Sequence, residues 1–220
     1  MNRRWTVVAF IFAGILISYI DRGNLGIAAP AIMREFSFEP SRMGVLLSAF
    51  FWTYALFEIP AGWMGDRWGP RRVLMRIVVW WSLFTAATGW VRGLWALLTT
   101  RALFGVGEAG CFPNLTKAFM AWLPSGERVR AQGIMWLSAR WGGALTPLVV
   151  IFVLHYFSWR HAFELFGLLG VVWAVAFFWW YRDDPRQHRS VNAAELEMLP
   201  KPSDVTLGHG RVPWKKLFTN

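Results

Sequence analysis

The sequence predicts an all-α polytopic membrane protein with six transmembrane helices. Of its 220 residues, 55% are hydrophobic and 17% are aromatic, whereas an ordinary soluble domain contains roughly 45–50% apolar residues. Apolar runs long enough to cross a bilayer recur along the first 181 residues. Lysine and arginine are concentrated on alternate connections between these runs, as the positive-inside rule requires.

Six segments have about the ~20 residues that a helix needs to span the hydrocarbon core. Backbone polar groups in lipid must be satisfied internally, and continuous apolar runs lack the alternating pattern of barrel strands, so each segment should be a helix. In chain order, the segments are Trp5–Met33, Gly44–Trp63, Val73–Val91, Trp95–Ala118, Gln132–His155 and Ala162–Tyr181.

The distribution of positive charge predicts the orientation of these segments. Of the 23 lysines and arginines, sixteen fall on one set of connections and termini, four on the other, and three inside the segments. Because cytoplasmic connections carry the excess of positive charge, we expect a multi-pass protein of the inner (plasma) membrane with both ends of the chain in the cytoplasm. The basic residues are dispersed among apolar runs, which argues against nucleic-acid binding despite a net charge of +10.

The first segment contains an adjacent pair of opposite charges, Asp21 and Arg22. The segment begins like a signal peptide, but no small-x-small cleavage site follows it, so we expect a retained span. A charged side chain near the bilayer centre costs roughly 2.5–3.5 kcal/mol, and such residues usually face the bundle interior and mark a transport pathway. The pair is therefore a candidate functional site.

The second segment and the turn after it carry further polar candidates. Tyr54 can place a hydroxyl in a central cavity or pack as an ordinary aromatic, and Glu58 is better placed for a gating contact than for substrate binding. In the turn, we expect the acidic side chain to form a latch by accepting from helix N-terminal amides or pairing with a neighbouring arginine. An ordinary basic loop would explain the arginines of this turn but not its aspartate or its spaced glycines. The gating residues are Gly62, Gly65, Asp66, Arg67, Gly69, Arg71 and Arg72.

The fourth segment reads R-x-x-x-G-x-G-E-x-x-x-x-P from Arg101 through Glu108 to Pro113. Seven residues are close to two helical turns, so the two charges should project from one face. Its glycines allow another helix or a substrate to come close, and the proline can kink the helix. On the fifth segment, Arg140 is either a second anion-binding cation or a structural partner of Glu108 or Asp21.

The central charges must pair with one another or line a wet cavity, because together they would cost on the order of 15 kcal/mol if unpaired in lipid. After Tyr181 the composition becomes polar and rich in proline. We therefore divide the chain into a six-helix transmembrane half, residues 1–181, and a cytoplasmic connector, residues 182–220. Residues 214–218 look like the approach to another span, so we expect this chain to be part of a longer protein.

The turn GWMGDRWGPRR resembles the signature between the second and third helices of the major facilitator superfamily. The stretches SYIDRGNL, RALFGVGEAGCFPN and WLPSGERVRA are similar to its anion:cation symporter branch, which includes permeases for galactonate, glucarate, hexuronates and phthalate. The resemblance implies half of a 12-helix fold, built as two inverted three-helix repeats, with a missing C-terminal six-helix half in the same polypeptide.

The resemblance also implies roles for individual residues. Arg22 would bind the substrate carboxylate, Tyr54 would line the cavity, Asp21 and Glu108 would be the proton-coupling acids, and Arg101 would organise them. Glu58 departs from the pattern, since many relatives are expected to have Gln there.

The predicted function is secondary active transport, with proton-coupled uptake of an organic carboxylate, a sugar acid or an aromatic acid, by alternating access. The expected partners are a small organic anion, protons and the lipid bilayer. Two alternatives remain open, an organic-anion exchanger without proton coupling and a non-transporting membrane sensor or assembly module. An enzyme is not expected, nor are a cofactor or a metal, because no metal cluster, nucleophile–base pair or phosphate loop is recognisable in the sequence.

Overall fold

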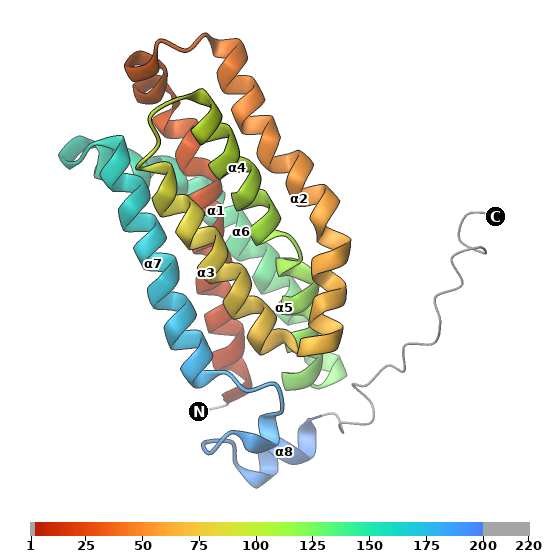
Figure 1. Cartoon of the computed structure of the whole chain (residues 1–220). Coiled ribbons are helices and arrows are strands. Elements are labelled where there is room, and N and C mark those ends of the chain that lie inside the picture. The colour runs from red at the N-terminus through yellow and green to blue at the C-terminus, as the bar shows by residue number, and fades with distance from the viewer. Residues whose placement is uncertain (1–2, 200–220) are drawn as a thin grey trace, which may run out of the picture.

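The computed structural model describes residues 3–199, and these residues form an elongated helical bundle (Figure 1). Residues 200–220, the rest of the predicted connector, lie outside the described residues. The elements in chain order are α1 (Arg3–Phe36), α2 (Pro40–Trp68), α3 (Pro70–Thr88), α4 (Leu94–Glu108), α5 (Cys111–Trp122), α6 (Ser125–Tyr156), α7 (Trp159–Trp180), the 3₁₀ turn η1 (Pro185–Gln187) and α8 (Ala193–Met198).

Helix boundaries follow local sequence signals. Pro40 and Pro70 occupy the first turns of α2 and α3, where the missing N–H is not needed. Ser158 caps α7 by accepting a hydrogen bond from the backbone N–H of His161. Gly69, the residue between α2 and α3, has a φ of 80°, a conformation that favours glycine and lets two long helices meet without a loop.

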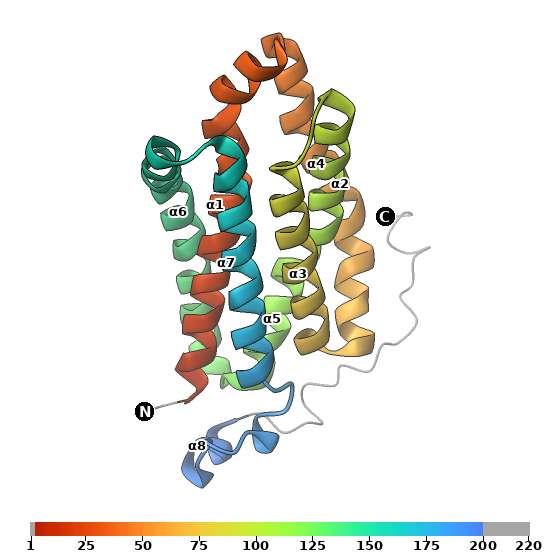
Figure 2. The ribbon, with the colours of Figure 1, turned by 60° about the vertical axis from the view of Figure 1, so that its left-hand side comes forward.

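The bundle is held by three principal helix pairs, α1 with α6, α3 with α7 and α2 with α4. Figure 2 shows α1 beside α6 and α7, with α2 and α4 on the other side. The N-terminus of α1, the α2–α3 junction and the segment from Arg182 to Met198 share one end of the bundle, which we call the connector end (Figures 1 and 2).

Four of the described helices are long and apolar enough to cross a membrane: α1, α2, α6 and α7. They coincide with the first, second, fifth and sixth predicted segments. The third predicted segment corresponds to α3, which has 19 residues and carries three arginines in its first two turns. Many large apolar side chains are exposed, among them Trp52 (78%) and Ile59 (75%). Such a surface suits a protein surrounded by lipid.

The fourth predicted segment is not one helix with a kink at its proline. It is divided into α4 and α5 by Ala109 and Gly110, and Pro113 lies in the first turn of α5, where a proline fits. Gly110 has a φ of 78°, and a Cβ there would come within 2.8 Å of the Ala61 carbonyl carbon on α2. The close approach of α2 therefore favours a break at Gly110, two residues after Glu108.

Helix α2 extends beyond both ends of the second predicted segment. Most of the predicted gating turn is helical, because α2 continues to Trp68 and α3 begins at Pro70. The charged residues of this turn therefore project from the ends of two helices.

Candidate functional site

The central site begins with a polar stripe on α1. Ser18, Asp21 and Asn24 recur every three residues and are each 0–1% exposed, so they share the face of α1 that is buried in the bundle. The neighbouring Arg22 is partly buried, with 19% of its side chain exposed. The cluster predicted from sequence therefore lies inside the bundle and not on its lipid-facing surface.

Glu108 is the acceptor around which the site is built. Its carboxylate lies at the end of α4 and is fully buried. Arg22 donates from Nε to Oε1 of this carboxylate at 2.9 Å, and the Ser18 hydroxyl donates to the same oxygen. Oε2 of Glu108 has no hydrogen-bond partner within residues 3–199. The ion pair joins the first helix of the chain to α4, as the sequence predicted in general terms.

The Arg22 guanidinium is surrounded by aromatic rings. Its Cζ lies 5.0 Å from the ring centroid of Tyr19, 4.9 Å from that of Tyr54 and 5.2 Å from that of Phe50. Phe112, at 6.0 Å, closes the group from α5. Arginine stacks favourably on such faces, so these rings orient the guanidinium while leaving its Nη groups without a hydrogen bond among the described residues.

Asp21 and Arg101 form a second, deeper part of the site. Asp21 is 0% and Arg101 is 2% exposed, and each interacts electrostatically with the other and with Glu108. Both Asp21 oxygens, and Nε and Nη2 of Arg101, lack hydrogen-bond partners within the described chain. Phe104 and Phe163 flank the Arg101 guanidinium at 5.1 and 5.4 Å.

The glycines that precede Glu108 allow neighbouring helices to approach α4. A Cβ on Gly105 would lie 2.6 Å from the Phe50 carbonyl oxygen of α2, and one on Gly107 would lie 2.7 Å from Cγ of Trp80 on α3. Both separations are too short for real side chains. The sequence left open whether a helix or a substrate uses this space, and the structure fills it with helices.

The structure also shows the surroundings of Arg140 and Glu58. Arg140 is exposed on α6 and has no ion pair or hydrogen bond within residues 3–199, so it is not a structural partner of Glu108 or Asp21 in this structure. Glu58, for which we expected a gating contact, lies one turn from Tyr54, whose hydroxyl donates to Oε1 of Glu58 at 3.5 Å.

The gating residues are connected to α5 and α7. Asp66 forms an ion pair with Lys117 of α5, whereas we expected a helix N-terminus or a neighbouring arginine. Lys117 also donates to the Gly62 carbonyl oxygen at 2.7 Å. Arg71 donates through Nε and Nη2 to the Phe178 carbonyl oxygen of α7, at 3.1 and 2.6 Å. Hydrogen bonds and an ion pair therefore connect the α2–α3 junction to α5 and to α7.

Sequence reasoning did not single out Ser18 or the aromatic residues Tyr19, Phe50 and Phe112. Ser18 lies four residues before Arg22 on the same helix, so helical spacing alone could have identified it. The two phenylalanines come from other helices, and no spacing rule relates them to Arg22.

Comparison with known proteins places these features in a family. Residues 11–220 match the model of the Major Facilitator Superfamily. The chain is 37% identical over 210 residues to the probable sulfoacetate transporter SauU of Cupriavidus necator, covering 92% of this chain and 47% of the relative. It is 35% identical to the D-galactonate transporter of Escherichia coli, with coverages of 90% and 46%. The chain spans about half the length of these curated relatives.

Another relative is the probable galactarate/D-glucarate transporter GudP of Escherichia coli, which is 34% identical over 90% of this chain and 45% of its own length. All three relatives are named as transporters, in agreement with the prediction that the chain is not an enzyme.

Solved structures show the same fold. The proton:xylose symporter XylE superposes with a TM-score of 0.75 at 12% identity, over 94% of this chain and 52% of its own. A bacterial homologue of the lysosomal transporter Spinster superposes with a TM-score of 0.73 at 23% identity, over 97% and 47%. Together with the family match over residues 11–220, these findings show that the chain belongs to the major facilitator superfamily.

Proposed function

We propose that this chain forms the N-terminal half of a secondary active transporter that takes up a small organic carboxylate by alternating access. The observation that carries the proposal is the state of Arg22. Only its Nε is engaged, by Glu108, and its Nη groups face aromatic rings without a hydrogen bond in residues 3–199. A planar guanidinium with free donors suits bidentate binding of a carboxylate.

The relatives support an anionic substrate. These relatives are named as transporters of sulfoacetate, galactonate, and galactarate or glucarate, all of which are anions of organic acids. In the proposed site, Arg22 binds the carboxylate, the Tyr54 hydroxyl contributes a polar group, and exposed Arg140 acts as a second cation. Glu58 shares a hydrogen bond with Tyr54, so it belongs to the same cavity.

Proton coupling is assigned to Asp21 and Glu108, with Arg101 as the residue that organises them. Burying an ionised carboxylate without a partner costs several kcal/mol, and a proton on Asp21 removes that cost. Protonation of Glu108 weakens its ion pair with Arg22, which frees the guanidinium for substrate. Loading of protons and loading of the anion are thereby linked through one residue.

Exchange without proton coupling is the competing function. It is favoured by one observation, the ion pair that already neutralises Glu108 through Arg22. If this carboxylate stays ionised throughout, an incoming anion replaces an outgoing one and no proton moves.

We propose that residues 1–181 form six spans arranged as two inverted three-helix repeats, and that residues 182–220 lead to a second six-helix half. Taking α4 with α5 as one span, exchange of the two triplets converts the α1–α6 pair into the α4–α2 pair and keeps α3 with α7. The three principal helix pairs therefore obey the symmetry that such repeats require. Both ends of this half are assigned to the cytoplasm of the inner membrane by the positive-inside rule, with the Asp66–Lys117 pair as the gating contact.

The substrate assignment is tested in proteoliposomes with the full-length protein. Uptake of radiolabelled galactonate, glucarate and sulfoacetate is measured for the parent, for Arg22→Lys and for Arg92→Lys, a matched change at an exposed arginine. Lysine keeps the positive charge but cannot donate two parallel hydrogen bonds to one carboxylate. Arg22→Lys should therefore reduce uptake roughly 10–100-fold, while Arg92→Lys should leave uptake unchanged. Equal uptake by the two variants would remove Arg22 from the substrate site.

The two coupling modes are separated by a pH electrode in the outside medium. A proton symporter alkalinises the medium when substrate enters, whereas an exchanger gives no pH change and requires substrate inside the vesicles.

A further inference from the structure

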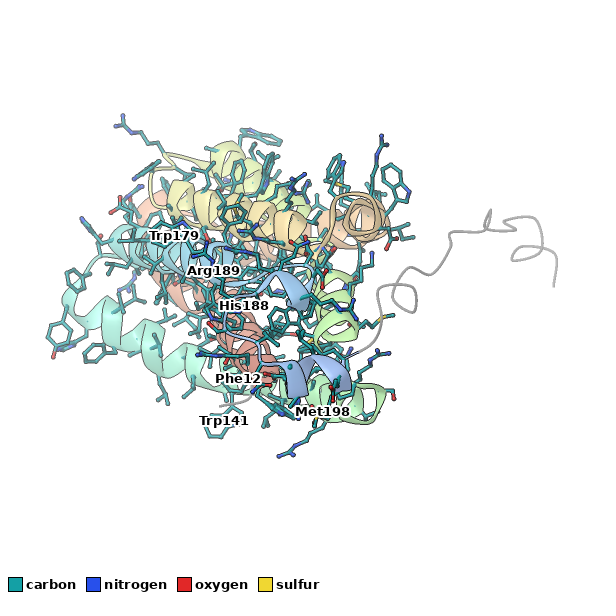
Figure 3. All side chains as sticks on the ribbon, turned by 90° about the horizontal axis from the view of Figure 1, so that it is seen from below. Phe12, Trp141, Trp179, His188, Arg189 and Met198 are labelled. Atoms are coloured by element: carbon teal, nitrogen blue, oxygen red, sulfur yellow. The ribbon has the colours of Figure 1, made fainter. Side chains whose placement is uncertain are left out.

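A cavity lies at the connector end, away from the central site. It has a volume of about 560 Å³ and lies between the end of α7 and the turn that follows it. Figure 3 looks onto this end and shows Trp179, His188 and Arg189 beside one another. The cavity is lined by Trp179, Trp180, Arg182, Gln187, His188 and Arg189.

The cavity is positively charged. Arg182 donates only through Nη1, to the carbonyl oxygens of Phe178 and Trp179 in the last turn of α7 and of Tyr181 directly after it, at 3.3, 2.8 and 2.9 Å. Its Nε and Nη2, and the whole Arg189 guanidinium, make no hydrogen bond within residues 3–199. Burial, followed by the proximity of Arg182, lowers the pKa of His188, as a positive potential requires.

The nearby acidic side chains already have partners. Asp183 accepts from the backbone N–H of Arg71 at 2.7 Å, and Asp184 accepts from the backbone N–H of Arg186 at 2.9 Å. Neither is among the residues that line the cavity. The free donors there therefore face no carboxylate from the lining.

The turn that carries Arg189 is fixed to the bundle by His188. The His188 ring lies 5.6 Å from Trp122 at the end of α5 and 4.8 Å from Trp180 at the end of α7. Its Nδ1 accepts a hydrogen bond from the Ser190 backbone N–H at 3.3 Å. Arg189 is thus held next to the last turn of α7.

An apolar stripe on α7 leads to the cavity. Its exposed side chains recur at intervals of three or four residues and therefore share one face of the helix. They are Leu165 (43%), Leu168 (60%), Val172 (57%), Val175 (45%) and Trp179 (75%). Tryptophan at the end of such a stripe is typical of the boundary between hydrocarbon and headgroups.

We propose that this cavity binds the phosphate headgroup of an anionic glycerophospholipid, with Arg182 and Arg189 as the phosphate ligands and the acyl chains along the α7 stripe. Two charges and an adjoining apolar face match the two parts of such a lipid. Basic pockets at the ends of transmembrane helices bind anionic headgroups in this way. The site is independent of the central transport site, since none of its lining residues contacts Arg22 or Glu108.

The proposal is tested by native mass spectrometry of the full-length protein in detergent, titrated with phosphatidylglycerol. Arg189→Gln removes a ligand whose side chain makes no hydrogen bond within residues 3–199, and Arg130→Gln makes the same change in charge on α6, outside the cavity. One arginine near a headgroup should account for about fivefold in affinity. We therefore expect Arg189→Gln to weaken phosphatidylglycerol binding about fivefold and Arg130→Gln to leave it unchanged.

Binding and competition measurements with other ligands distinguish a phospholipid from a soluble phosphate ester. Phosphatidylcholine should bind much more weakly than phosphatidylglycerol, and glycerol 1-phosphate, which lacks acyl chains, should not compete at equal concentration. Full competition by glycerol 1-phosphate would replace the lipid with a soluble phosphate ester and overturn the proposal. Equal losses in Arg189→Gln and Arg130→Gln would also overturn it, since binding would then reflect net charge alone.

Discussion

Buried charges gather at two places in the described bundle, around Glu108 in its interior and around Glu195 at the connector end. At the connector end, Arg4 donates from Nε and Nη2 to the two oxygens of Glu127, at 2.8 and 3.0 Å. Glu195 accepts from the backbone N–H groups of Arg3 and Arg4, at 3.2 and 2.8 Å. The first two described N–H groups of α1 are thereby capped by a carboxylate from α8.

The two clusters differ in how completely their polar atoms are bonded. No side-chain atom of Arg4, Glu127 or Glu195 is buried without a partner in residues 3–199. In the central cluster, both Asp21 oxygens and one Glu108 oxygen have no hydrogen-bond partner within the same residues. A fully bonded network favours one arrangement, whereas an incompletely bonded one can accept a proton or a ligand. We therefore propose that the connector-end cluster serves stability and the central cluster serves transport.

The largest expected effect on stability is that of Arg4→Met. Methionine keeps much of the apolar stem but leaves Glu127 without its partner, so the free energy of unfolding should fall by about 3 kcal/mol. Reversible unfolding in detergent, followed by tryptophan fluorescence, measures this change. Arg130→Met, which removes an exposed arginine of α6, is the control. A loss in Arg4→Met no larger than in the control would show that the network contributes nothing.

Glu195 variants should have a smaller, graded effect. Glu195→Gln keeps one oxygen that can accept from the α1 backbone, so we expect a loss of about 1 kcal/mol, against about 2 kcal/mol for Glu195→Ala. The same unfolding assay orders the two variants. Equal stability of Glu195→Ala and the parent would mean that α8 does not cap α1.

Asp21→Asn should have the smallest effect on stability. It removes a buried charge that has no hydrogen bond in the described chain and keeps the side-chain volume, so the free energy of unfolding should change by less than about 1 kcal/mol or rise. A loss as large as that of Arg4→Met would contradict the contrast between the clusters and give Asp21 a structural role.

Much of the central cluster could be predicted because its members lie on two helices. Asp21 and Arg22 are costly in an apolar run, and Arg101 and Glu108 are two turns apart, so charge and helical spacing were sufficient to group them. Where their helices meet depends on packing that no local pattern contains. Phe50 from α2 and Phe112 from α5, which lie beside Arg22, were missed for that reason, and the position of Arg140 remained open.

The corrections have the same origin. Pro113 carries a helix-breaking signal, but the break lies at Gly110 because α2 leaves no space for a side chain there. Asp66 pairs with Lys117, and these two residues are 51 positions apart in the numbering of the chain. The Arg4–Glu127–Glu195 network also joins three distant parts of the chain. Local propensity placed the helices, and tertiary packing decided which side chains meet.

The most direct test of the central claim compares two transport modes in proteoliposomes containing the full-length protein. In the proposed mechanism, concentrative uptake under an inward proton gradient needs the proposed coupling acids, whereas counterflow with substrate on both sides needs only binding and alternating access. Glu108→Gln should abolish gradient-driven accumulation and retain counterflow, while Glu195→Gln should retain both. Accumulation by Glu108→Gln at the level of the parent would contradict the assignment of Glu108 as a coupling acid.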